Sequence, residues 1–287
     1  MGKEKPKIVW IGNRKWTPVL KFVLENLANS VDVPVVFTEP GNEDSFENLG
    51  YKKENIYTSH LNNHSEEFLR EVNNGCLDFG VTFGCSYLIK SPILGYIPLF
   101  GTHPTKLPIG RGHAPLNWNI REGLTESAAT MMWLNKGEDT GAIAYQEPYS
   151  IGEQENVTQL LGKVNGVYCG IMSRLVRDFS RGTIPRISQD NLDVEPTRRR
   201  RRLSPEDGII TLEMDIATAN RIYRATTEPF PGARLEYDDH RIILWDAEIV
   251  PYSETLEKNL KDKKDAPAYD ISGNKLIIIH RGELERK

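Results

Sequence analysis

The sequence predicts an α/β protein in which an open, mostly parallel sheet is followed by a small β-rich domain. In the first half of the chain, short apolar segments alternate with segments of helical periodicity, a pattern typical of parallel strands joined by crossovers. Near the C-terminus, strand-like segments follow one another, and a turn at Asp238-Asp239 joins two of them as a hairpin. A chain of 287 residues is long enough for two such cores.

Apolar runs and helical spacing locate the elements of the first domain. Ser65 and Gly75 are placed to begin and end one helix, and a long amphipathic helix with a core-facing stripe is expected over 157–179. An earlier helix is expected over 17–30, and strands over 7–13, 33–40, 77–84 and 95–103. Ligands of open α/β sheets bind beyond the carboxyl ends of the strands, so 83–88 and the residues from His103 onward are expected to share one cleft.

A segment rich in Pro, Gly and polar residues, 180–197, separates the two predicted domains. We expect a first domain over 1–182, a linker over 183–203 and a C-terminal domain over 204–287. The second domain is expected to have a helix over 216–227 and an OB-like, β-rich architecture, with strands over 233–239, 240–250 and 274–282.

Composition excludes several classes of protein. A net charge of -4 and a pI near 5.9 disfavour a general polyanion binder. The three cysteines lack paired or metal-like spacing, the N-terminus does not read as a signal peptide, and no apolar run reaches the roughly 20 residues of a membrane helix. We therefore expect a cytoplasmic protein without a metal site, and surface positions for the scattered histidines His60, His64, His113, His240 and His280.

Two residues of the central region are of types suited to acid–base chemistry. His103 follows an apolar segment and begins a loop rich in Pro, Gly and Arg, and Asp139 lies in the acidic loop "NKGEDTGAI" before another strand-like segment. A carboxylate beside an imidazole fixes its tautomer and favours its charged form, which allows the ring to act as a general base or acid. Spacing alone leaves open whether the two meet, because a single His is often structural and Asp near Gly often forms a turn.

The motifs "HPTKLPIGRGHAPLNW" and "EGLTESAATMMWLNKGEDTGAI" resemble the central pattern of the folate-dependent formyltransferases. That pattern is roughly Asn-x-His-Pro-Ser-x-Leu-Pro-x-x-Arg-Gly, followed by a Thr-bearing strand and Asp-x-Gly. "FGCSYLI" is similar to the folate-binding stretch, and "RRLSPEDGIITL" and "PFPGARLEY" are similar to a C-terminal domain found in several members. "RGHAPLNW" and "SPEDG…PFPGA" are most similar to members that formylate the amino-arabinose nucleotide of lipid A modification.

The resemblance implies a formyl donor, 10-formyltetrahydrofolate, and a role for each matching residue. His103 would lie near the formyl carbon, with Asp139 acting through it or through a water. Arg111 would tie down its loop or bind substrate, and both readings stay open. Asn117 is a further candidate for the substrate site. Folate would be held by backbone groups of Phe83, Gly84, Cys85, Ser86 and Leu88. The loop over it would be shaped by Leu107 and Pro108.

The chain departs from the family pattern at Gly101, where the pattern has Asn. Residues two apart in a strand face the same way, so Gly101 removes a side chain from the side that carries His103. Loss of an oxyanion donor from a fixed site costs about 2.7–4 kcal/mol. Asn117, Asn119 or a water are candidates to replace it. Alternatively the reaction is hydrolytic, as in the similar hydrolase domain of formyltetrahydrofolate dehydrogenase, which also lacks the Asn, or the chain is a weak catalyst.

The expected function is transfer of a formyl group from 10-formyltetrahydrofolate to the amine of a nucleotide-linked amino sugar. The alternatives are a 10-formyltetrahydrofolate hydrolase, a methionyl-tRNA formyltransferase and a folate-binding scaffold without turnover. The arginine run 198–202 is compatible with tRNA binding. Acidic residues follow it, however, and no aromatic residues are interleaved with the arginines. A solvated tract, or one that touches a nucleotide diphosphate, is therefore favoured. A nucleic-acid or membrane partner is not expected, and self-association through C-terminal strands as a homodimer is possible.

Overall fold

The chain divides into two compact units, each described by itself. The computed structural model describes residues 5–194, 197–211, 213–262 and 268–286. The first unit contains Met1–Gly112, Ser127–Tyr149 and Lys163–Arg199, and the second contains His113–Glu126, Ser150–Gly162 and Arg200–Lys287. Two segments that the sequence placed in the first domain, 113–126 and 150–162, thus group with the C-terminal part of the chain.

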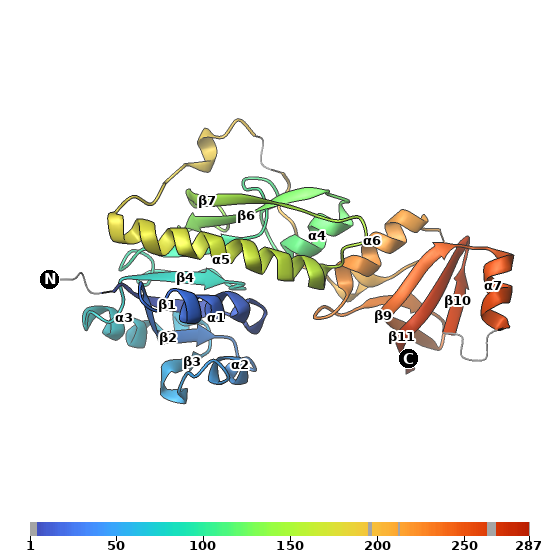
Figure 1. Ribbon diagram of the computed structural model, residues 1–287, viewed down its shortest axis with the longest axis horizontal. Helices are drawn as coiled ribbons and strands as arrows, with labels where there is room; N and C mark the ends of the chain where they lie inside the picture. Colours follow the sequence, from blue (N-terminus) through green and yellow to red (C-terminus); the bar gives the residue numbers. More distant parts are fainter. Residues whose placement is uncertain (1–4, 195–196, 212, 263–267, 287) are drawn as a thin grey trace. The chain divides into compact units, whose positions relative to one another are not determined.

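The first unit is built on a seven-stranded sheet with the order β3-β2-β1-β4-β5-β6-β7 (Figure 1). β1 pairs in parallel with β2 and β4, β2 with β3, and β4 with β5, whereas β5 and β6 are antiparallel. This mostly parallel sheet confirms the predicted fold class. The strands are β1 (Lys7–Gly12), β2 (Asp32–Thr38), β3 (Ile56–Thr58), β4 (Phe79–Phe83), β5 (Leu99–His103), β6 (Glu126–Trp133) and β7 (Ile143–Ser150).

Helices connect these strands as the periodicity predicts. They are α1 (Thr17–Asn26), α2 (Glu43–Glu47), α3 (Ser65–Asn73) and α5 (Val157–Arg181), with short 3-10 turns at Arg14–Trp16, Lys53–Asn55, Leu61–His64 and Gln189–Asn191. Ser65 is the first residue of α3 rather than its cap, and Gly75 follows the helix with φ +68°, which suits glycine. Val164, Tyr168 and Leu175 of α5 are fully buried, so its apolar stripe is core as expected.

The second unit contains a four-stranded sheet with the order β10-β11-β9-β8. Its strands pair in antiparallel fashion, β10 with β11, β11 with β9 and β8 with β9, and Glu236 of β8 pairs with Arg241 of β9 across the predicted Asp238-Asp239 turn. The β-rich C-terminal domain is therefore confirmed. The elements are α4 (Pro115–Arg121), a 3-10 turn (Pro205–Gly208), α6 (Ile216–Thr226), β8 (Ala233–Glu236), β9 (His240–Pro251), α7 (Glu254–Lys261), β10 (Ala268–Ser272) and β11 (Lys275–Arg286).

Three of the histidines that we expected at the surface, His64, His113 and His240, are only partly exposed. The His64 side chain is 23% exposed, and its ring lies against the rings of Phe37 and Tyr57. Within the described ranges, no three His, Cys, Asp or Glu side chains are grouped as metal ligands would be. In the same part of the chain, no helix combines the length and apolar character required to span a membrane.

Candidate active site

His103 is the last residue of β5, at the carboxyl edge of the parallel strands. Its side chain is 6% exposed, and its backbone pairs with Thr130 on the antiparallel strand β6. The carbonyl of Thr130 accepts a hydrogen bond from the Tyr168 hydroxyl at 3.2 Å. Burial raises the pKa of Tyr168 well above its usual value, so this phenol stays a neutral donor beneath the strand pair. The imidazole is thus fixed on rigid elements.

Asp139 lies beside His103, as the sequence analysis required for acid–base chemistry. Asp139 Oδ1 is 3.6 Å from His103 Nδ1, and Oδ2 accepts a hydrogen bond from the backbone N–H of Gly112 at 2.8 Å. Asp139 has φ +55°, a left-handed conformation that Asp tolerates better than most residues. The turn therefore directs the carboxylate toward the ring while anchoring its second oxygen.

Hydrogen bonding defines which imidazole nitrogen carries a proton. His103 Nε2 lies 2.9 Å from the carbonyl oxygen of Gly110. Because a carbonyl only accepts, Nε2 is the donor, and in the neutral ring Nδ1 is the basic atom that faces Asp139. When Nδ1 takes a proton, the ring becomes a cation next to a carboxylate. This arrangement suits a general base whose charged form is stabilised by its neighbour.

Gln189 holds the Asp139 loop and was not identified from the sequence. It is 3% exposed, and its Nε2 donates to the carbonyls of Asp139 and Gly141 at 2.9 and 2.8 Å. Its Oε1 accepts two hydrogen bonds from the Arg111 guanidinium, at 3.2 and 2.6 Å. Arg111 therefore ties the loops together through Gln189, which supports the first of the two roles left open for it. Gln189 lies in the expected linker, where its sequence context gave no functional signal.

Three side chains hold the turn that follows His103. Hydroxyls of Tyr149 and Thr130 donate to the carbonyls of Pro104 and Thr105 at 2.8 and 2.6 Å, and Gln146 donates to the Leu107 carbonyl at 3.0 Å. The Leu107 side chain is buried against Met132 and Ile143 in a small apolar cluster. Leu107 thus shapes the loop from within, and the expected contact of Leu107 and Pro108 with folate stays a prediction.

The expected folate segment is a tight turn after β4. Gly84 has φ +68°, and a Cβ there would lie 2.5 Å from the Trp16 indole nitrogen, so only glycine fits. Asn13 donates to the carbonyls of Phe83 and Gly84, through its backbone N–H and its side-chain amide. Because these two carbonyls already accept from Asn13, a pterin would contact other backbone groups of this turn.

The side chains of this segment differ in exposure and in partner. Burial raises the pKa of Cys85 to about 11, which keeps the thiol neutral. Ser86 hydrogen-bonds to Glu39. Leu88 is 47% exposed, and its carbonyl accepts from Asn62 at 2.8 Å. The segment is therefore anchored at both ends, and its expected contact with folate stays a prediction.

The two asparagines considered as replacement donors belong to the second unit and have structural partners there. Asn117 is 1% exposed, and its amide donates to the Ala225 carbonyl of α6 at 2.7 Å. Asn119 is fully buried and accepts from the Arg200 guanidinium at 2.8 Å. The observed contacts of Asn117 thus join α4 to α6, and they do not support the substrate role expected for it.

Leu134 occupies the space beside Gly101. A Cβ built on Gly101 would lie 2.4 Å from Leu134 Cδ2 and 3.4 Å from its Cγ. Leu134 is anchored by a hydrogen bond from its N–H to the Leu99 carbonyl at 2.7 Å and packs against the apolar core of the first unit. An alkyl side chain, rather than a donor, therefore fills the position of the family's Asn.

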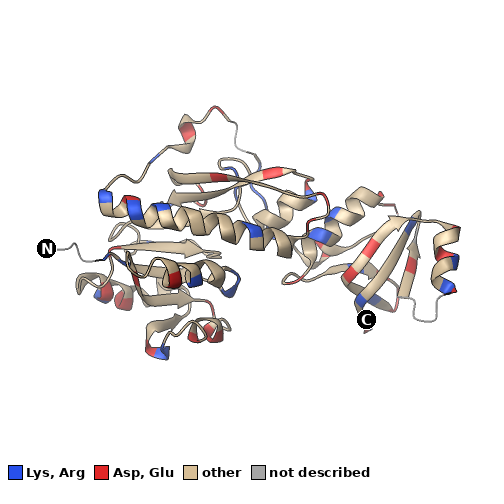
Figure 2. Cartoon of the chain, in the orientation of Figure 1, with Lys and Arg blue, Asp and Glu red and all other residues tan. Residues whose placement is uncertain are grey.

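Three of the five consecutive arginines form ion pairs within their own unit. Arg199 pairs with Glu138 at 2.6 Å, Arg200 with Glu122 at 2.5 Å and Arg201 with Asp207 at 2.6 Å. Figure 2 shows acidic and basic positions interspersed in the chain, as on α7. The arginine run is thus largely neutralised internally, which does not favour a phosphate-binding footprint.

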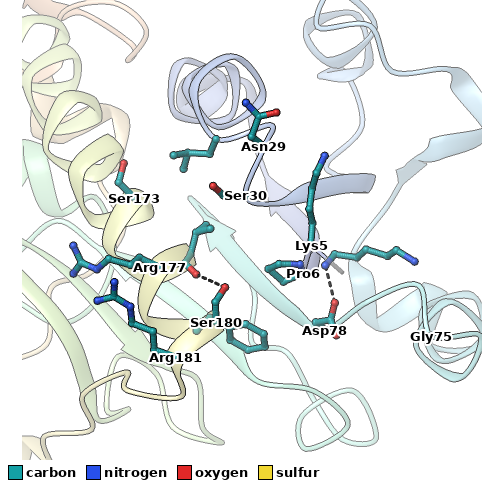
Figure 3. Close-up of a pocket in the computed structure, with 14 residues that line it drawn as sticks. Lys5, Pro6, Asn29, Ser30, Gly75, Asp78, Ser173, Arg177, Ser180 and Arg181 are labelled. Carbon is teal, nitrogen blue, oxygen red and sulfur yellow. Dashed lines mark hydrogen bonds between the residues drawn. The ribbon is translucent and has the colours of Figure 1, made fainter. Parts of the chain in front are cut away.

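A separate hollow of about 580 Å³ lies at the opposite edge of the first unit's sheet. It is lined by residues just before β1 and β4, by the end of α1 and by the last turns of α5. Figure 3 shows the Arg177 and Arg181 side chains pointing away from Lys5 rather than toward a common point. Arg181 lies in the last turn of α5, where the helix dipole favours a cation, and Arg177 pairs with Asp178 at 2.8 Å, so neither arginine needs a ligand to account for it.

The structure is an α/β fold with a close His–Asp pair at the carboxyl edge of its parallel strands. The family model described as formyl transferase matches residues 25–175, and the formyl transferase C-terminal domain matches 202–283. The chain belongs to the formyl transferase family and is a formyl-transferring enzyme, as the motifs around His103 predicted.

Several solved structures share this fold. A variant of HypX from Aquifex aeolicus has 14% identity and TM-score 0.69, and the match covers 96% of this chain but 44% of HypX. Methionyl-tRNA formyltransferase from Clostridium thermocellum has 17% identity, TM-score 0.63 and coverage of 98% and 99%. A 4-N formyltransferase from Francisella tularensis has 20% identity, TM-score 0.61 and coverage of 81% and 93%. HypX has also been solved with tetrahydrofolic acid.

Proposed function

We propose that the protein transfers a formyl group from 10-formyltetrahydrofolate to the amine of a nucleotide-linked amino sugar. The observation that carries this proposal is the 3.6 Å approach of His103 Nδ1 to Asp139 Oδ1 at the carboxyl edge of the sheet. Membership of the formyl transferase family supports the reaction, and the solved HypX complex with tetrahydrofolic acid supports the donor class.

The chain's residues supply binding and proton transfer. The folate donor provides an activated formyl carbon. His103 Nδ1 accepts the proton that the attacking amine must lose, and Asp139 stabilises the resulting imidazolium. Gly110 and Gly112 hold the two groups through backbone contacts, so little reorganisation is needed when charge develops. Gln189 and Arg111 keep the loop of Asp139 in place.

The choice of an amino-sugar nucleotide as acceptor is supported by sequence and by fold. The segments "RGHAPLNW" and "PFPGA" resemble those of sugar-nucleotide formyltransferases. A solved sugar N-formyltransferase from Shewanella and a 4-N formyltransferase from Francisella tularensis share the fold over 81% of this chain. A tRNA acceptor is less well supported, because the arginines that would contact phosphates have acidic partners in the chain.

Hydrolysis of 10-formyltetrahydrofolate is a second candidate, because Gly101 stands where the family pattern has Asn, as in the similar hydrolase domain of formyltetrahydrofolate dehydrogenase. Without a side-chain donor at that position, the stabilisation of the reacting oxygen is weaker than in the family pattern. Water would then take the place of the amine, and formate would be released.

Product analysis tests the proposal and separates the two reactions. The purified protein is incubated with 10-formyltetrahydrofolate that carries an isotopic label in its formyl group, with and without a panel of nucleotide-linked amino sugars and charged initiator tRNA. We expect label in an N-formyl sugar nucleotide. Label in formate alone would establish the hydrolase, and label in the aminoacyl-tRNA, with binding that weakens steeply as salt rises, would establish the tRNA enzyme.

A further inference from the structure

Leu134 and Gly101 lie on the same face of the sheet as His103. Side chains alternate along a strand, so positions 101 and 103 of β5 project to one side. Gly101 pairs with Thr82 of β4 and Met132 of β6, which fixes its backbone in the middle of the sheet. Its Cβ position is 2.4 Å from Leu134 Cδ2 and 3.5 Å from the Met132 methyl group. The wall of the site next to His103 is therefore alkyl.

We propose that Leu134 is a specificity-determining residue, whose side chain takes the space of an amide donor beside His103 and keeps water away from that wall. The inference rests on the proposed formyl transfer. In this proposal, Leu134 determines how the formyl group is divided between an amine and water as acceptors. An apolar group at this place cannot hydrogen-bond an attacking water, whereas an amine bound through the rest of its sugar nucleotide needs no support there.

Both reactions break the same bond and differ in the bond that forms. The bond between the formyl carbon and folate N10 breaks, and N10 takes up a proton. The new bond forms either to the amine nitrogen, giving an N-formyl product, or to a water oxygen, giving formate. In each case the nucleophile loses one proton to the His103–Asp139 pair, which returns it to N10.

Truncation of Leu134 tests the exclusion of water. In Leu134→Ala the freed space admits water, and we expect the ratio of formate to N-formyl product to rise at least about fivefold. Leu134→Met, a matched control of similar volume, should keep the wild-type ratio. An unchanged ratio in a folded Leu134→Ala protein overturns the proposal. Formate release needs no sugar acceptor, so an increased rate of release in Leu134→Ala supports water exclusion even if the sugar proposal fails.

A double-mutant cycle tests whether Leu134 fills the amide's place. Gly101→Asn alone should lower the unfolding midpoint, because its Cβ and amide meet Leu134, and Gly101→Asn with Leu134→Ala should recover it. In the double variant, a restored donor should raise the transfer rate by about 10²-fold over Leu134→Ala. Additive effects on both unfolding and rate would overturn the proposal. Because unfolding is measured without substrate, this arm is independent of the enzymatic function.

Discussion

His103 Nδ1 and Asp139 Oδ1 lie 3.6 Å apart, although one residue ends β5 and the other lies in the loop after β6. The carboxylate is held by the Gly112 N–H and the imidazole by the Gly110 carbonyl. Both anchors come from the loop rich in Pro, Gly and Arg that follows His103. This loop therefore positions both side chains.

Asp139→Asn is expected to lower kcat by about 10²-fold or more, because a neutral amide does not stabilise the imidazolium. The Asn oxygen can still accept from Gly112, so the unfolding midpoint should change little. Initial rates and thermal unfolding of the same preparation check both parts. A kcat within twofold of wild type would show that the carboxylate charge has no part in turnover.

Arg111→Ala and Gln189→Ala are expected to lower kcat by similar factors, because each substitution releases the Asp139 loop. Both should leave the KM for the acceptor unchanged. Gln189→Glu is the matched control, since it keeps an acceptor for Arg111 but loses the donor to the carbonyls of Asp139 and Gly141. It should also lower kcat. If Arg111→Ala instead raises the acceptor KM while both Gln189 variants leave it unaltered, Arg111 binds substrate directly.

Arg200→Ala is expected to reduce the free energy of unfolding by about 1–3 kcal/mol, because it leaves the buried Asn119 oxygen without its guanidinium partner. Arg198→Ala, at an exposed position of the same run, should change that free energy by less than about 0.5 kcal/mol. Urea unfolding compares the two. Equal effects would mean that the buried contacts of Arg200 do not stabilise the protein.

Acid should destabilise the protein in part through Asp207. Hydrogen bonds from Arg201 and the Ser204 N–H lower the pKa of this carboxyl from 3.8 to about 2. A lowered pKa gives stability that is present above the unfolded-state value and is lost as pH falls toward 2. The difference in Asp207 pKa between the unfolded and folded chains corresponds to at most about 2 kcal/mol of unfolding free energy. Solvent around the exposed Arg201 reduces this contribution to about 1 kcal/mol.

Asp207→Asn is therefore expected to flatten the fall in unfolding free energy between pH 5 and pH 2 by about 1 kcal/mol. The measurement is urea unfolding at several pH values for both proteins. Parallel curves over this range would show that Asp207 titrates alike in the folded and unfolded chains.

The sequence predicted the elements that carry strong periodicity. The apolar runs that end at Gly12, Phe83 and His103 are strands, and the stripe through Val164 and Leu175 marks the core face of α5. The helix α4 was not predicted, because Ala114 is in the left-handed region directly before Pro115 and the motif is short. The short elements α2, β3, α7 and β10 were also not predicted from local pattern.

The site was predictable where residue type determines chemistry and not where packing does. His103 and Asp139 were identified by their chemical types and by the resemblance, and their side chains meet. Leu134 and Gln189 were not identified, because an apolar residue near a strand end and a polar residue in a linker carry no local signal. Their positions follow from the antiparallel β5–β6 pairing and from the return of the chain over the Asp139 loop.

The central claim is that His103 takes the proton that the amine loses when it attacks the formyl carbon, and His103→Ala tests it most directly. The measurement follows labelled formyl from 10-formyltetrahydrofolate into the amino-sugar product and formate, together with folate affinity, in the wild-type and variant proteins. We expect turnover to fall by about 10²–10⁴-fold with folate affinity unchanged. Equal turnover by the two proteins, or none by the wild type with any acceptor or with water, would contradict the account.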